Sequence, residues 1–156
     1  MLASLGLSPG FAAAQGYARP VVQSLPDPAA SRLSDALRQL SRDPRSVPAL
    51  VDAGQASLAL DDVEAAEGFL RRAEAVAPGD GRVKAGLASV MVRRRQPVEA
   101  LRLFAEAEQA GEPMRFHAAE RGLAYDLIGD NVHAQEAYRA FLSMGDDPLV
   151  TRRLAL

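Results

Sequence analysis

The sequence contains no cysteine among its 156 residues. This absence excludes disulfide bonds, thiol nucleophiles and cysteine-based zinc sites. Tryptophan is also absent, and aromatic residues make up only 5% of the chain although 48% of it is hydrophobic. Much of the apolar content is alanine, and a core built from such small side chains requires helices that approach one another closely.

The chain also lacks a strong net charge and a long apolar run. Its formal net charge is -2, so it generates no overall field that favours nucleic acid or a membrane surface. No stretch approaches the ~18 unbroken apolar residues of a membrane-spanning helix. We therefore expect no nucleic-acid partner and no integral membrane segment.

Residue patterns typical of enzyme active sites are missing as well. There is no Gly-x-Ser-x-Gly elbow and no glycine-rich phosphate loop. His117 and His133 are the only histidines, and both are expected on the surface near the start of a helix. The clustered carboxylates fall on a turn and the first turn of a helix, where negative charge suits the helix dipole: Asp61, Asp62, Glu64 and Glu67. We expect no catalytic residues, no metal site and no cofactor.

The first fifteen residues, MLASLGLSPGFAAAQ, are apolar and uncharged. Small residues at Ala12 and Ala14 are typical of the cleavage region of a secretory signal peptide, but the first basic residue is Arg19. Two interpretations stay open, a signal remnant and a disordered Ala/Gly-rich tail. Prolines follow at 20, 26 and 28, which predicts a leader and linker over 1–27 and a folded domain over 28–156.

Helix start and stop signals divide the domain into a series of helices. Apolar residues recur at helical spacing, and proline, glycine or a capping aspartate or serine marks the boundaries. No segment alternates with period two for long enough to be a strand. The fold class is therefore all-α, with helices expected over about 28–41, 47–60, 63–77, 81–94, 97–110, 113–128 and 131–144.

A residue pattern recurs along these helices every 34 residues. Three alanines mark it: Ala66, Ala100 and Ala134. Four residues after each alanine comes a bulky side chain, at Leu70, Phe104 and Tyr138. Twelve residues before each comes a very small one, at Gly54, Ala88 and Gly122. A fixed period of this length indicates stacked structural repeats.

The pattern resembles the tetratricopeptide repeat (TPR), a helix–turn–helix unit of 34 residues. The units cover about 47–80, 81–114 and 115–148, with a partial fourth unit over 149–156. Several positions depart from the family pattern, which has an aromatic residue at Ser57, a large apolar residue at Lys84 and leucine at Arg121. Pro113 comes one place late, and Phe141 stands where a small residue is usual. The resemblance implies a right-handed α-solenoid of three helix pairs, preceded by an extra helix and followed by a short one.

The resemblance also implies a concave groove, lined by the first helix of each pair, that holds a peptide or a segment of a partner protein. It places the groove residues at Val51, Gln55, Leu58, Arg82, Ser89, Val92, Arg93, Phe116, Leu123 and Asp126. Some family members bind acidic C-terminal tails through lysines and asparagines in this groove. Here Val51, Gln55 and Gly86 stand at the corresponding places, so a role in binding such tails is not expected.

Two further features allow two interpretations each. The run Arg93-Arg94-Arg95 is either a solvated helix end that complements the helix dipole or an anion-binding patch at the rim of the groove. The apolar C-terminal segment, with Leu149, is either a makeshift cap or the start of a longer array. An open apolar end would favour self-association.

These observations predict a non-catalytic protein-interaction scaffold. The chain resembles exported bacterial TPR proteins, which implies a periplasmic location and a role in envelope assembly. The alternatives are a cytoplasmic adaptor or assembly chaperone with the same groove, and a regulatory region of a larger polypeptide.

Overall fold

The computed structural model describes residues 27–145 and 147–154, so the predicted leader lies outside the described residues. Within these ranges all regular structure is helical, which confirms the predicted all-α class. In chain order the elements are α1 (Pro28–Leu40), α2 (Val47–Ala59), α3 (Val63–Val76), α4 (Gly81–Arg93), α5 (Pro97–Gln109), the 3-10 turn η1 (Met114–His117), α6 (Ala118–Ile128), α7 (Asn131–Leu142) and α8 (Pro148–Leu154). None of the described helices is long and apolar enough to cross a membrane.

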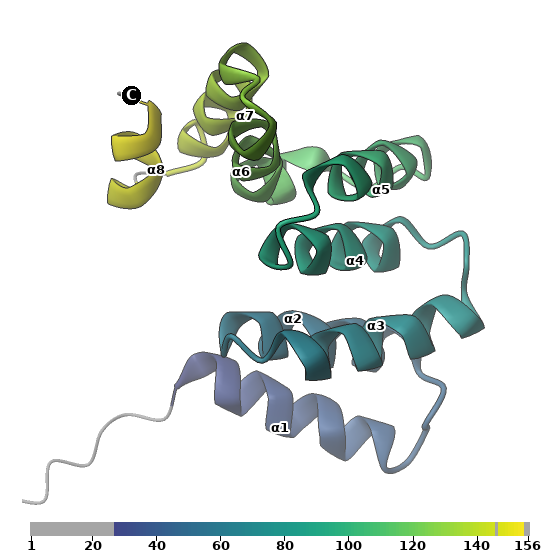
Figure 1. The fold of residues 1–156 in the computed structure, drawn as a ribbon. Coiled ribbons are helices and arrows are strands. Elements are labelled where there is room, and N and C mark those ends of the chain that lie inside the picture. Colours follow the sequence, from purple (N-terminus) through teal and green to yellow (C-terminus); the bar gives the residue numbers. More distant parts are fainter. Residues whose placement is uncertain (1–26, 146, 155–156) are drawn as a thin grey trace, which may run out of the picture.

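The helices stack as successive antiparallel pairs (Figure 1). α2 packs against α3, α4 against α5, and α6 against α7. The first helices also contact one another, because α2 touches α4 and α4 touches α6. α1 packs against α2 at one end of the stack, and α8 packs against α7 at the other. This arrangement is that of a helical repeat.

The turn within each pair repeats its geometry at the same period. Its central residue adopts a left-handed conformation in all three pairs, with φ of 62° at Asp61, 58° at Arg95 and 78° at Gly129. In each turn the next backbone N–H donates to a carbonyl five residues earlier: Asp62 to Ser57, Gln96 to Met91 and Asp130 to Tyr125. This bond satisfies a carbonyl at the helix end and sends the chain back antiparallel.

The small and bulky residues of the repeat meet in the core. A Cβ atom added to Gly54 would lie 2.6 Å from Cγ of Leu70, and one added to Gly122 would overlap the ring of Tyr138. Leu70 also lies against Gly86 of the next pair. Leu70 and Tyr138 are almost fully buried, so the missing side chains are what allow the helices to approach this closely.

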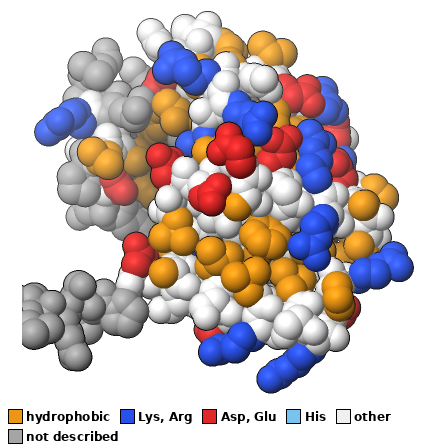
Figure 2. All heavy atoms as spheres, turned by 60° about the horizontal axis from the view of Figure 1, so that its bottom comes forward, with side chains coloured by type: hydrophobic (Ala, Val, Ile, Leu, Met, Phe, Trp, Pro, Cys, Tyr) orange, Lys and Arg blue, Asp and Glu red, His pale blue; other side chains and the backbone are white. Residues whose placement is uncertain are grey.

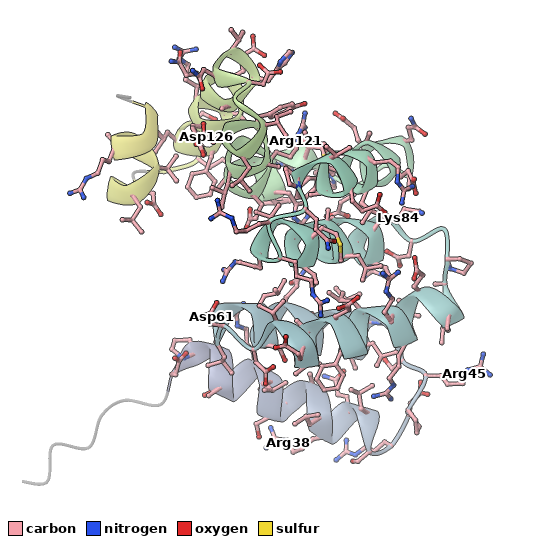
Figure 3. The ribbon with its side chains drawn as sticks, viewed as in Figure 1. Arg38, Arg45, Asp61, Lys84, Arg121 and Asp126 are labelled. Atoms are coloured by element: carbon pink, nitrogen blue, oxygen red, sulfur yellow. The ribbon has the colours of Figure 1, made fainter. Side chains whose placement is uncertain are left out.

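Two of the departures from the repeat pattern are satisfied by ion pairs to α5. Nζ of Lys84 on α4 lies 2.6 Å from a carboxylate oxygen of Glu106, and a guanidinium nitrogen of Arg121 on α6 lies 3.9 Å from Glu108 (Figure 3). Because of the bond to Lys84, the pKa of Glu106 lies below its ordinary value. Ser57, another departure, is fully buried and its Oγ has no hydrogen-bond partner among the described residues.

The first helix of the third pair begins differently from the prediction of one helix over 113–128. After Pro113 the chain forms the 3-10 turn η1, and α6 begins only at Ala118. The backbone of His117, at φ -115° and ψ 12°, separates the two elements. Met114 is buried against the core in this turn.

The third pair and α8 share a second, smaller core. Tyr138 and Ala134 of α7 are buried together with Val150 of α8. Leu149, next to Val150, remains 72% exposed. α8 therefore covers part of α7 while presenting an apolar side chain to solvent, and the predicted self-association through this end stays a prediction.

Candidate functional site

A cavity of about 470 Å³ lies between the first helices of the three pairs. It extends from α2 across α4 to η1 and α6, with one contribution from the turn before η1. Its lining, which we call the groove cavity, consists of Gln55, Leu58, Ala59, Gly86, Ser89, Arg93, Glu112, Phe116, His117 and Glu120. One cavity thus draws on three successive helix pairs.

The groove cavity has an apolar part on two sides. Leu58 and Ala59 come from the end of α2, and Phe116 comes from η1. Phe116 is 57% exposed, which is high for so large an apolar side chain. An exposed aromatic ring beside a cavity is a typical anchor point for a partner's apolar side chain.

The polar part of the groove cavity includes two carboxylates, Glu112 and Glu120. Oε1 of Glu112 lies within hydrogen-bond distance of Nε2 of His117, at 3.1 Å, and both side chains are largely buried. The ring of His117 also packs against Phe104, with 6.1 Å between the ring centroids. Glu120 lies half-buried in the same lining and makes no ion pair among the described residues.

The one arginine in the lining is already paired. Nη1 of Arg93 lies 2.7 Å from Oδ1 of Asp61, at the left-handed turn between α2 and α3. Figure 3 shows Asp61 at the end of the α2–α3 pair where the two helices are joined. The neighbouring Arg94 pairs with Glu67 of α3 at 2.5 Å. Two arginines of the basic run therefore bridge adjacent helix pairs, as expected of a helix end and not of a free anion-binding patch.

Arg82, at the start of α4, is surrounded by carboxylates. Its guanidinium lies 2.7 Å from Asp80, which caps the same helix. This hydrogen bond is the main reason why the pKa of Arg82 is raised and that of Asp80 is lowered. Glu112 and Asp52 raise the pKa of Arg82 further by charge attraction.

Five of the ten predicted groove residues line the groove cavity, namely Gln55, Leu58, Ser89, Arg93 and Phe116. Val51 and Val92 lie outside this lining and are buried in the core, at 4% and 3% exposure. The other three lie outside the lining, where Arg82 pairs with Asp80, Leu123 packs against the core, and Asp126 accepts a hydrogen bond from the Tyr138 hydroxyl.

The rest of the lining consists of Gly86, which the resemblance places in the groove at a tail-binding position, and of four residues not predicted there: Ala59, Glu112, His117 and Glu120. Glu112 belongs to the turn before η1, which the repeat register assigns to neither helix of a pair. His117 is not a plain surface residue, because its side chain is only 12% exposed, whereas His133 is 56% exposed and pairs with Asp130. Glu120 could have been predicted from the sequence, because it stands four residues after Phe116 and would share its face in the expected helix.

A second apolar surface lies at the α1 end of the stack. Figure 2, which turns this end forward, shows hydrophobic side chains gathered there. A shallow hollow in this region is lined mainly by Ala30, Leu33, Leu37 and Leu60. It contains one cation, Arg38, which pairs with Asp35 of its own helix.

The described residues contain no group of three or more side chains able to hold a metal ion. No model of a known protein family matches the chain, and no curated protein matches its sequence at a significant level. What the chain binds must therefore be argued from the groove cavity itself.

Proposed function

We propose that this chain is a non-catalytic scaffold of the TPR type that holds a peptide, or a segment of a partner protein, in the groove cavity. The observation that carries the proposal is the cavity of about 470 Å³ lined by the first helices of three successive pairs. Repeat stacks bind their partners on such extended concave surfaces.

The register supports the same proposal. α2 contacts α4, and α4 contacts α6, so the first helices of the three pairs lie side by side. Side chains from helices far apart in the sequence then line one cavity. Such a lining suits an extended partner that crosses several helices.

Site-specific photo-crosslinking tests this function. A photoreactive phenylalanine analogue replaces Gln55 in the groove cavity or, as a control, Val98 on α5, which is 74% exposed. We expect defined adducts with one partner segment from position 55 and none from position 98. Equal adducts from both positions, or adducts from position 98 alone, would contradict the proposal.

We further propose that the scaffold acts in the bacterial envelope after export, with a cytoplasmic adaptor, an assembly chaperone or a regulatory region of a larger polypeptide as alternatives. The export proposal rests on the signal-like composition of residues 1–15. N-terminal sequencing of the protein isolated from its cells tests it. A mature form that begins near Gln15 supports export, and a form that keeps Met1 contradicts it.

A further inference from the structure

We infer that the groove cavity selects partner segments in which a basic residue, arginine or lysine, stands next to an apolar residue. This inference rests on the proposed function and adds the chemistry of the partner to it. It is drawn from the charges and the apolar surface that the cavity presents side by side.

The carboxylates of the groove cavity outnumber the cations available to a ligand. Glu112 and Glu120 both belong to the lining, and the hydrogen-bond partner of Glu112 is a histidine, which is uncharged unless protonated. Arg93 is the only arginine or lysine of the lining, and Asp61 lies 2.7 Å from it. A ligand therefore meets an excess of negative charge.

Of the cations near the rim, Arg82 is also engaged by carboxylates. Arg82 is held by Asp80 and lies near Asp52 and Glu112. The guanidinium of Arg115 lies over the ring of Phe116, 4.5 Å from its centroid. Arg115 shows that the face of this ring accepts a cation, as expected from its electrostatic quadrupole.

The apolar and acidic parts of the groove cavity are close enough for two neighbouring residues of a ligand to contact both. Phe116 and Glu120 are four residues apart across the junction of η1 and α6, and both belong to the lining. An apolar ligand side chain placed on Phe116 and Leu58 would bring an adjacent basic residue towards Glu120 and Glu112. Partial enclosure strengthens such a charge-assisted hydrogen bond relative to one on an open surface.

An acidic partner is disfavoured by the same geometry. It would place a carboxylate near Glu112 and Glu120, and the guanidinium of Arg93 would have to leave Asp61 to compensate. Because the lining contains no unpaired cation, the groove cavity favours positively charged ligands. Charge complementarity of this kind makes binding selective.

A peptide array tests the inference. Octapeptides carry every pair of residues at their two central positions between Ala/Ser spacers, and the full-length labelled chain is applied to them. We expect apolar–Arg and apolar–Lys pairs to bind about fivefold more strongly than the matching apolar–Glu pairs. Apolar–Glu pairs that bind as well or better would overturn the inference.

Matched charge variants locate the preference. Glu120→Gln should reduce the ratio of binding between apolar–basic and apolar–Glu peptides to near one. Peptides with two apolar residues should still bind. Glu108→Gln, on an exposed carboxylate of α5 outside the lining, should leave the preference unchanged. If Glu120→Gln leaves it unchanged as well, the inference fails.

A blocking variant separates this inference from the proposed function. Gln55→Trp fills the groove cavity from an exposed position on α2, and circular dichroism checks that it folds. If it abolishes binding of all peptides regardless of charge and wild type shows no basic preference, the scaffold proposal stands and the inference falls. If it does not affect binding, both fall. A dimer that Phe116→Ala converts to monomer would also overturn the inference, because the occupant would then be a second copy of the chain.

Discussion

Gly122 on α6 lies directly against the ring of Tyr138 on α7, and the hydroxyl of that ring donates a hydrogen bond to Asp126 at 2.5 Å. The ring is thus held at both its face and its tip. The same relation joins Gly54 to Leu70, sixteen residues further along the chain. These contacts identify single residues on which the helix spacing depends.

Gly122→Ala should therefore lower stability by about 1–3 kcal/mol, because the added methyl group overlaps the buried ring of Tyr138. Gly68→Ala is the matched control, since its Cβ would meet no atom within 4 Å on α3. That change should raise stability by roughly 0.5–1 kcal/mol through helix propensity. Urea unfolding of the two variants and wild type measures both effects, and a destabilised Gly68→Ala or a neutral Gly122→Ala would contradict the described packing.

Ser57 is a polar residue in the interior of the helix stack. It is fully buried, and its Oγ has no hydrogen-bond partner among the described residues. Ser57→Ala should raise the free energy of unfolding by about 1 kcal/mol, because it removes an unsatisfied hydroxyl. Ser89→Ala is the control, because Oγ of Ser89 donates to the carbonyl of Ala85 at 3.2 Å and its loss brings no such gain. If thermal unfolding shows a lower melting temperature for Ser57→Ala, the hydroxyl has a partner that this account lacks.

At the scale of helices, the packing of α4 against α5 depends on Ala100. This residue is fully buried at the centre of the stack. Ala100→Leu should overpack the contact and lower stability by about 1–3 kcal/mol. Ala105→Leu introduces the same side chain at an exposed position of the same helix and should change stability little. Equal melting temperatures for the two variants would argue against the proposed repeat register.

The start of α4 should carry a measurable pH dependence. Asp80 caps the helix and accepts hydrogen bonds from Arg82, which hold the pKa of Asp80 below its ordinary value of 3.8. A lowered folded-state pKa means that ionised Asp80 stabilises the fold above about pH 4, and that this contribution is lost as the pH falls through the folded-state pKa. Wild type should therefore exceed Asp80→Asn in stability by under about 1 kcal/mol at neutral pH.

Urea unfolding at neutral pH and at about pH 3 checks this expectation, and the difference between the two proteins should shrink at the lower value. A difference that grows on acidification would show that the carboxylate does not stabilise the helix start. The two proteins differ only at residue 80.

At the scale of the whole molecule, local signals predicted the helices well. The helix ends follow from prolines and capping aspartates such as Asp62, Asp80 and Asp130, each of which accepts a hydrogen bond from a backbone N–H of the helix that it caps. These interactions are set within a few residues, so they can be read directly from the sequence. The period of 34 residues likewise relates glycines to the side chains that cover them.

The groove cavity was predicted only in part, because its lining depends on how successive pairs rotate against one another. That rotation is set by side-chain volumes in the core and leaves no periodic mark in the sequence. Val51 and Val92 are buried in the core, whereas His117 belongs to the lining. The 3-10 turn at Met114 contributes as well, because it displaces the start of α6 from the position that the repeat predicts.

The central claim is that a partner segment lies in the groove cavity across three helix pairs. The most direct test is an NMR titration of the isotope-labelled chain with the segment identified by photo-crosslinking. Addition of the segment should change the amide chemical shifts of Gln55 on α2, Ser89 on α4 and Phe116 on η1, all in the lining. The amide chemical shifts of Val98 on α5 and Val132 on α7 should change little. Shifts confined to α3, α5 and α7 would contradict the claim.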